Sequence, residues 1–212
     1  MPRKKEFDVD LVLDKAMTAF WNRGYEATSL NDLLDCMQIQ RASLYNAFGD
    51  KHSLFLNALH RYDAVYRQTE VAKRMKMASP RQAILDLFQD VVTAVVEHGA
   101  RNGCFLINTA LELSPHDPEV AEVVRKALTH MEQKFFRKMI EKGRAMGEIA
   151  KSAMPAPTAR ALLSLLIGLI VLSRSRPEKL LLQSIAYQAE VFLPPGDTAV
   201  QSLGTIPLAA TS

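Results

Sequence analysis

The stretch Tyr25–Phe55, YEATSLNDLLDCMQIQRASLYNAFGDKHSLF, decides the fold because it reads as two short helices joined by a tight turn. Ser29 precedes Asp32 by three residues, the spacing of a capping box, so a helix is expected to begin at this serine. Its apolar residues then fall on one helical face: Leu30, Leu33, Leu34 and Met37.

The second helix of the pair is expected at Arg41–Phe48. The segment Gln38–Gln40 is too short to be more than a turn, and its one apolar residue, Ile39, is placed to fill the corner between two helices. Gly49 can end the second helix in the left-handed conformation, and Asp50 can cap the next one. This pattern predicts a helix-turn-helix, in which one helix enters the major groove of DNA and the other braces it.

Residue types and spacings in and around this pair match one known family together. The matching runs are Gly24-Tyr25, Ala27-Thr28-Ser29, Ala42-Ser43-Leu44-Tyr45, Phe48-Gly49-Asp50-Lys51 and Leu54-Phe55. They resemble the DNA-binding domain of the TetR family of one-component bacterial repressors. The chain departs from the family at two positions: Gln38 stands where a glycine is usual, and Gln40 stands where a small hydroxyl cap is usual.

The composition is that of a soluble globular protein in one large or two modest domains, with 212 residues, 48% hydrophobic and 23% charged. The net charge of +3 is only mildly basic, so composition alone does not indicate DNA binding. Binding requires instead that basic side chains share one surface. Two cysteines, Cys36 and Cys104, give no disulfide framework, which fits a reducing cytoplasm.

Nothing in the sequence predicts secretion or membrane insertion. The start MPRKKEFD has no apolar run behind it and is not a secretory signal. The most apolar segment, Ala161–Leu172, is well short of the roughly 20 residues that a membrane span needs. We therefore expect a cytoplasmic protein with no membrane partner.

Helical periodicity continues along the whole chain and predicts an all-α fold of about nine helices. The expected ranges are 8–23, 29–37, 41–48, 50–76, 81–97, 104–113, 119–146, 158–174 and 178–193. We expect a three-helix DNA-binding domain at 1–50, an effector-binding and dimerisation domain at 51–193, and a flexible tail at 194–212. The long helix 50–76 joins the two domains, with Phe55, Ala58, Leu59, Tyr62 and Val65 or Tyr66 on its inner face. Because a continuous helix is stiff, a tilt at its far end must move the recognition helix.

The expected DNA contacts fall into two groups. Base reading is assigned to residues at the start and on the outer face of the second helix: Gln40, Arg41, Ala42, Ser43 and Asn46. Phosphate contacts are assigned to the basic N-terminal arm and to residues beside the pair: Arg3, Lys4, Lys5, Thr28, Tyr45 and Lys51. A solvated terminus is the alternative for the arm, and simple solvent exposure is the alternative for Lys51.

The last two helices, 158–174 and 178–193, are expected to hold a homodimer together. Apolar residues of the first cover too much of its circumference for the surface of a monomer: Ala161, Leu162, Leu165, Leu166, Leu169, Ile170 and Leu172. The resemblance implies a four-helix bundle of both subunits. Two-fold symmetry would place two recognition helices about one DNA turn apart, which predicts an inverted-repeat operator.

Cys104 is a candidate sensor. It follows Gly103 at the expected start of a helix, where the helix dipole and unpaired N–H groups favour a thiolate. His98 and Arg101 lie close in sequence and could add positive charge. The Gly-Cys step resembles a subset of the family in which this cysteine senses electrophiles or oxidants. The alternative is a small buried packing residue.

A conventional small-molecule inducer pocket is compatible with either interpretation of Cys104. Its expected apolar walls are Phe88, Val92, Phe105, Met131 and Phe135, and its candidate polar contacts are Asn108, Glu112 and His116. The same residues would also suit an ordinary core. Glu112 is the strongest polar candidate, because an acid on an apolar helix needs a partner or solvent.

The sequence gives no sign of an enzyme, a cofactor or a metal. It contains no Gly-rich phosphate loop and no Cys-x-x-Cys pair, and His98, Cys104 and His116 have spacings that arise often by chance. Ser114, His116 and Asp117 surround a proline turn and cannot hold the geometry of a catalytic triad. Two alternatives to a repressor remain: a helical small-molecule-binding protein or enzyme with a vestigial helix-turn-helix, and a DNA-binding protein without an effector.

Overall fold

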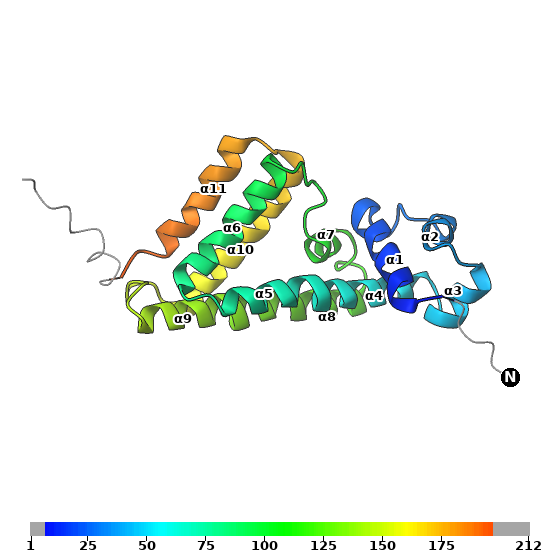
Figure 1. Ribbon diagram of the computed structural model, residues 1–212, viewed down its shortest axis with the longest axis horizontal. Coiled ribbons are helices and arrows are strands. Elements are labelled where there is room, and N and C mark those ends of the chain that lie inside the picture. Colours follow the sequence, from blue (N-terminus) through cyan, green and yellow to red (C-terminus); the bar gives the residue numbers. More distant parts are fainter. Residues whose placement is uncertain (1–6, 197–212) are drawn as a thin grey trace, which may run out of the picture. The chain divides into compact units, whose positions relative to one another are not determined.

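The computed structural model describes residues 7–196, and these residues divide into two compact units. Unit 1 runs to Glu70 and also contains Asn102–Ala127, whereas unit 2 contains Val71–Arg101 and the chain from Leu128 onward. The expectation of an all-α fold is confirmed over the described range, where uninterrupted helices number nine and the only β pairing is an isolated bridge between Ile149 and Pro195 (Figure 1).

Unit 1 is built around α1. Its helices are α1 (Val9–Arg23), α2 (Leu30–Met37), α3 (Arg41–Phe48), α4 (Lys51–Arg61), a π-helical segment η1 (Tyr62–Arg67), α7 (Phe105–Glu112) and most of α8 (Pro118–His130). α1 packs against both α2 and α4, and α3 packs against α4. Phe20, Leu33, Leu44, Phe55 and Leu59 are fully or almost fully buried. The apolar faces predicted from helical spacing therefore meet in one core.

Polar contacts cap α1 and link it to α4. The carboxylate of Asp8 accepts from the backbone N–H groups of Asp10 and Leu11, which begins α1. Arg61 of α4 donates to the carboxylates of Asp10 and Asp14 of α1. The hydrogen bond from Arg61 to Asp14 holds the pKa of Asp14 below its usual value. α4 is thus tied to α1 by charge as well as by apolar packing.

Unit 2 is a helical bundle whose core is almost entirely apolar. Its helices are most of α5 (Gln68–Met75), α6 (Pro80–Val96), a second π-helical segment η2 (Met131–Phe136), α9 (Arg137–Ala145), α10 (Pro155–Ser175) and α11 (Lys179–Phe192). α6, α10 and α11 lie side by side (Figure 1). Phe88, Val92, Phe135, Leu162 and Leu169 are buried among them.

α10 is longer than the apolar run in the sequence suggested. It has 21 residues and a mean hydropathy of 1.8, so by length and composition alone it could cross a membrane. It lies instead against α6, α9, α11 and η2, with Ala159, Leu162, Leu166 and Leu169 buried in the core of unit 2. A third of its most apolar part is buried within one chain.

Each of the two long helices contains a wider π-helical turn. In the predicted helix 50–76, η1 lies between α4 and α5, and in the predicted helix 119–146, η2 lies between α8 and α9. The expectation that Val65 or Tyr66 faces inward is wrong, since these side chains are 46% and 45% exposed. A π turn takes more residues than an α turn and rotates the following side chains away from the face that regular spacing predicts.

Candidate DNA-binding surface and sensor region

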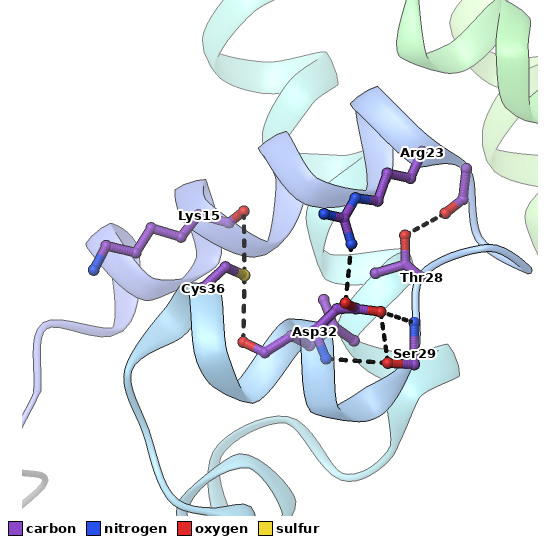
Figure 2. Close-up of polar contacts among 8 residues, drawn as sticks. Lys15, Arg23, Thr28, Ser29, Asp32 and Cys36 are labelled. Atoms are coloured by element: carbon purple, nitrogen blue, oxygen red, sulfur yellow. Dashed lines mark hydrogen bonds and ion pairs between the residues drawn. The ribbon is translucent and has the colours of Figure 1, made fainter.

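A reciprocal capping box begins the first helix of the pair. Ser29 Oγ accepts from the Asp32 backbone N–H at 3.1 Å, and Asp32 Oδ2 accepts from the Ser29 backbone N–H at 2.9 Å. Figure 2 shows Arg23 approaching the same carboxylate, with Nη1 at 2.9 Å from Oδ1. Hydrogen bonds from Ser29, with a smaller contribution from Arg23, hold the pKa of Asp32 below its usual value. The predicted start of α2 is therefore confirmed.

The turn between α2 and α3 keeps its geometry without a glycine. Gln38 adopts φ +56° and ψ +43°, and it is the only non-glycine residue with positive φ among the described residues. The backbone N–H groups of Gln38 and Ile39 both donate to the carbonyl of Leu34 and close the end of α2. Gln40 is the N-cap of α3, but its side chain makes no capping hydrogen bond.

α3 presents one buried face and one exposed face. Leu44 and Phe48 point into the core of unit 1 and fix the rotation of the helix. The predicted base-reading residues Gln40, Arg41, Ala42 and Asn46 are exposed, as is the predicted phosphate contact Tyr45, and Ser43 is half-buried. The Arg41 guanidinium donates to Asn31 Oδ1 at 3.2 Å, so α2 orients the arginine at the start of α3.

Lys51 occupies the first position of α4, directly after the Asp50 cap. Asp50 Oδ1 accepts from the Ser53 backbone N–H at 2.7 Å. The Lys51 ammonium lies 4.1 Å from the centre of the Tyr25 ring, a cation–π distance. Lys51 is therefore held close to the N-terminus of α4, where phosphate binding is favourable.

Thr28 must be removed from the predicted DNA contacts. Its side chain is fully buried, and its hydroxyl donates to the Gly24 carbonyl at 2.6 Å, which closes the turn between α1 and α2 (Figure 2). A hydroxyl without exposed surface cannot reach a phosphate, so Thr28 stabilises the turn. The members of the predicted phosphate group in the N-terminal arm, Arg3, Lys4 and Lys5, lie outside the described residues.

Cys104 is the N-cap of α7 and faces Tyr62. The Tyr62 hydroxyl donates to Cys104 Sγ at 3.4 Å, and the thiol makes no capping hydrogen bond of its own. The neighbouring carbonyls of Asn102 and Gly103 each lie 3.2 Å from Trp21 Nε1, which donates to both. Burial raises the pKa of Tyr62 well above its usual value. Tyr62 therefore stays protonated and keeps its hydrogen for the sulfur.

Cys36 has a different environment. Its thiol donates to the Leu33 carbonyl at 3.3 Å, and burial raises its pKa (Figure 2). It lines an open groove of about 800 Å³ between α1 and α2, beside Lys15 and Asp35. A thiol with a raised pKa is a poor nucleophile, which makes Cys36 a useful internal control for Cys104.

The residues predicted to line a pocket divide between the two units. Cys104, Phe105, Asn108, Glu112 and His116 belong to unit 1, whereas Phe88, Val92, Met131 and Phe135 belong to the buried core of unit 2. The inducer pocket as a whole remains a prediction. Phe105 packs edge-on against Phe55 and Tyr62, with ring centres 5.5 and 5.7 Å apart.

Two of the predicted polar pocket residues are engaged in contacts within unit 1. Asn108 Nδ2 donates to the Asn102 carbonyl at 2.8 Å. Glu112 Oε1 accepts from the Glu26 backbone N–H at 2.9 Å. The partner that an acid on an apolar helix requires is thus a backbone group of the turn between α1 and α2. His116 is exposed.

Unit 1 contains one polar pair that the sequence does not predict. His52 Nε2 lies 2.6 Å from Asp117 Oδ2, although the two residues are 65 positions apart. The cap at Asp117 was predictable from the following proline, but nothing in the sequence marks His52 as its second partner. Among the described residues, no three His, Cys, Asp or Glu side chains gather in a way that could hold a metal ion.

Two segments of the chain match known protein families. Residues 12–58 match the family described as bacterial regulatory proteins, tetR family, and residues 80–185 match the tetracyclin repressor-like C-terminal domain. Both matched segments contribute to the fold described above, since the first contains α2, α3 and most of α4, and the second contains α6 to α10.

Curated relatives and solved structures agree with these matches. The uncharacterized HTH-type transcriptional regulator YezE of Bacillus subtilis is 38% identical over 150 residues, which are 70% of this chain and 76% of YezE. The HTH-type transcriptional repressor ComR of Escherichia coli is 34% identical over 148 residues, 69% of this chain and 70% of ComR. A cysteine mutant of the TetR family transcriptional regulator CifR, complexed with 26 bp double-strand operator DNA, has a TM-score of 0.78 at 28% identity and covers 92% of this chain and 100% of its own. The chain therefore belongs to the TetR family of helix-turn-helix transcriptional regulators.

Proposed function

We propose that this regulator binds an inverted-repeat operator as a homodimer and leaves it when a small molecule, an electrophile or an oxidant acts on the chain. The exposed face of α3 is the observation that carries the DNA-binding part of the proposal. Gln40, Arg41, Ala42 and Asn46 are all exposed on a helix whose opposite face is locked into a core. Arg41 suits guanine, and Gln40 or Asn46 suits adenine.

Phosphate contacts supply most of the affinity in this proposal and carry no sequence information. Tyr45 is 47% exposed on α3, and Lys51 stands at the N-terminus of α4. The basic arm with Arg3, Lys4 and Lys5 completes the set. Thr28 is not part of it, because its side chain is buried.

The homodimer is assigned to α10 and α11. α11 exposes several large apolar side chains, with Leu180 at 81%, Tyr187 at 60% and Val191 at 59%. Only a third of the most apolar part of α10 is buried within one chain. A second copy of the same pair would cover both faces by a two-fold interface, as the family resemblance implies.

Cys104 is the proposed site of thiol chemistry. Its thiol is half-buried at the N-terminus of α7, makes no capping bond and accepts from Tyr62. Addition of its thiolate to a maleimide would form a sulfur–carbon bond, with the resulting carbanion taking a proton from water. The added group would displace Tyr62, which is the first residue of the π-helical segment η1 that follows α4. A simple packing role for Cys104 is the alternative.

The remaining proposals concern organisation and location. We assign the DNA-binding domain to 1–50, the effector-binding and dimerisation domain to 51–193 and a tail to 194–212, and we place the protein in the cytoplasm. An apolar inducer pocket among the effector-domain helices is a second route to release. In both routes, separation of the two recognition helices would weaken binding.

Fluorescence anisotropy on inverted-repeat DNA from beside the protein's own gene tests the proposal. The protein is titrated onto this DNA and onto random DNA, with and without N-ethylmaleimide, and the Cys104→Ser and Cys36→Ser variants are treated in the same way. We expect selective binding that the reagent abolishes in the unmodified protein and in Cys36→Ser, and that persists in Cys104→Ser.

Other outcomes separate the alternatives. Selective binding that the reagent leaves unchanged in every variant would refute the thiol sensor and leave the pocket. Salt-dependent binding without sequence preference would indicate a DNA-binding protein that has no operator, and no DNA binding would indicate a helical protein with a vestigial helix-turn-helix.

A further inference from the structure

The segment Asn102–Asp117 forms hydrogen bonds with the N-terminal helices at several points, although it lies far from them in sequence. Residues 102–127 form one compact unit with residues up to Glu70, whereas the residues directly before them, Val71–Arg101, belong to the other unit. The segment is therefore structurally a part of the DNA-binding body. Three of its polar contacts reach three different elements of that body.

The first contact is made by the Glu112 carboxylate. Its Oε1 accepts from the Glu26 backbone N–H at 2.9 Å, in the turn that joins α1 to α2. The same carboxylate lies against Gly24, where a Cβ atom would be only 2.8 Å from Oε2. Gly24 has φ +90°, so this glycine satisfies both the backbone conformation and the close approach of the acid.

The second contact is made at the start of the segment. The Asn102 and Gly103 carbonyls accept from Trp21 Nε1, and Asn102 Nδ2 donates to Asn22 Oδ1 at 2.7 Å. Both partners are in the last turns of α1. The C-terminal end of α1 and the turn that follows it are thus held from the same side, at Asn102 and at Glu112.

The third contact is made at the end of the segment. Asp117 Oδ2 lies 2.6 Å from His52 Nε2 in the first turn of α4, directly after the recognition helix and its Gly49-Asp50 stop. The carboxylates of Glu112 and Asp117 therefore hold the chain on the N-terminal side of α2 and on the C-terminal side of α3. The helix-turn-helix lies between these two anchored points.

We propose that Asn102–Asp117 is a clamp that fixes the orientation of the helix-turn-helix, with Glu112 as the positioning residue for the turn between α1 and α2. Glu112 does not touch DNA in this proposal. It acts through Glu26 and Gly24, because an anchored turn leaves α2 and α3 less freedom to lose on binding. The clamp deepens the proposed function, on which it rests: an event at Cys104, in the same segment, would act on the helix-turn-helix directly.

Three substitutions at one position test the clamp. Glu112→Ala removes the acceptor, Glu112→Asp withdraws it by one methylene group, and Glu112→Gln keeps an oxygen of nearly the same reach. We expect operator affinity to fall roughly tenfold for Ala and Asp, the scale of a charge-assisted hydrogen bond, and to stay within about threefold for Gln. Affinity for random DNA should change by less than about twofold in all three, because phosphate contacts dominate it. Glu119→Ala, an exposed acid at the start of α8, is the matched control.

Spacing of the operator half-sites distinguishes positioning from a general loss of stability. A looser clamp lets the recognition helices tilt, so Glu112→Ala should discriminate less than the unmodified protein between operators whose half-sites differ by one base pair. Thermal unfolding followed by circular dichroism verifies that each variant is folded. If Glu112→Ala does not fold, Glu112→Asp takes its place, because it also removes the contact.

The outcomes keep the clamp separate from the proposed function. If the unmodified protein prefers its operator and folded Glu112→Ala binds that operator within about twofold of it, with unchanged spacing selectivity, the clamp is overturned. An equal loss for Ala, Asp and Gln would also overturn it, because Gln keeps the acceptor. If the unmodified protein shows no operator preference at all, the proposed function itself fails.

Discussion

His52 Nε2 lies 2.6 Å from Asp117 Oδ2 and joins the helix that follows the recognition helix to the first turn of α8. The other carboxylate oxygen, Oδ1, accepts from the backbone N–H groups of Glu119 and Val120 at 3.0 Å. These backbone hydrogen bonds, chiefly that of Val120, and the contact with His52 hold the pKa of Asp117 below its usual value. One carboxylate thus serves both as a helix cap and as a link between distant segments.

The two roles of Asp117 can be separated by substitution. Asp117→Ala removes the cap and should cost about 1 kcal/mol of unfolding free energy, whereas Asp117→Asn keeps a capping oxygen and should cost much less. Urea unfolding followed by the fluorescence of Trp21, the only tryptophan in the chain, measures both. An equal loss in the two variants would assign the stabilisation to the charge opposite His52 instead of the cap.

Acid should weaken unit 1 before unit 2. Among the described residues, every carboxylate with a lowered pKa belongs to unit 1: Asp14, Asp32, Asp50, Asp117 and Glu122, the last at about 2. Their stabilisation is present above the ordinary values of 3.8 and 4.5 and is lost as the pH falls through the lowered ones. Below about pH 4, Trp21 fluorescence should therefore change before the helical circular dichroism signal is lost. Coincident transitions, or a transition well above pH 4.5, would contradict this expectation.

Local signals made most of the helix boundaries predictable. Ser29 with Asp32, and Gly49 with Asp50, end and begin helices through backbone groups only a few residues away, so their spacing carries the information. The exposed face of α3 follows in the same way from Leu44 and Phe48. These features need no knowledge of the rest of the fold.

Contacts between distant residues were not predictable from spacing. Glu112 and Glu26 are 86 positions apart, and no periodicity encodes their meeting. The prediction that Thr28 contacts phosphate is wrong, because its hydroxyl donates to the carbonyl of Gly24 and closes a turn. Regular α-helical spacing predicts that Val65 or Tyr66 faces inward, but this segment forms a π turn and both side chains are exposed.

Glycine in place of Gln38 should stabilise the helix-turn-helix. A left-handed conformation costs a non-glycine residue roughly 1–2 kcal/mol, and glycine gives back about 0.5–1 kcal/mol in the unfolded chain. Gln38→Gly should therefore raise the unfolding free energy by up to about 1 kcal/mol. Gln38→Ala keeps the strain and is the control. A lower stability for the glycine variant would show that the Gln38 side chain makes a compensating contact.

A better N-cap at position 40 should make the protein more stable but lower its affinity for the operator. Gln40 makes no capping hydrogen bond, so Gln40→Ser should add about 1 kcal/mol of stability through a side-chain oxygen that accepts from the start of α3. If Gln40 reads a base, the same variant should lose operator affinity while random-DNA affinity stays constant. Urea unfolding and anisotropy on the two DNAs measure both effects, and unchanged operator binding would remove Gln40 from the base-reading group.

The proposed dimer makes a prediction about α11. Val191→Glu places a charge on an apolar face that a second copy would bury, so it should shift the protein to a monomer and weaken operator binding by more than about tenfold. Met146→Glu introduces the same charge at an exposed position after α9 and is the control. Sedimentation velocity gives the oligomeric state. A dimer that survives Val191→Glu unchanged would place the interface elsewhere.

The division between base reading and phosphate binding is testable at Arg41 and Lys51. Arg41 is exposed at the start of α3 and oriented by Asn31, as a base-reading arginine requires, whereas Lys51 stands at the N-terminus of α4 over the Tyr25 ring. Arg41→Ala should cost about 1–3 kcal/mol on the operator and relax specificity at one base position. Lys51→Ala should weaken operator and random DNA alike and reduce the salt dependence of binding by about one phosphate contact.

Salt titrations on both DNAs decide between these roles. The slope of log affinity against log salt concentration reports the number of phosphate contacts. The ratio of operator affinity to random-DNA affinity measures base reading. Asn31→Ala serves as a second variant, since it releases the Arg41 guanidinium without removing its charge. It should lower the operator-to-random ratio in the same direction as Arg41→Ala and leave the salt slope unchanged. Equal losses on both DNAs for Arg41→Ala and Lys51→Ala would mean that Arg41 also binds phosphate, and base reading would then fall to Gln40 and Asn46.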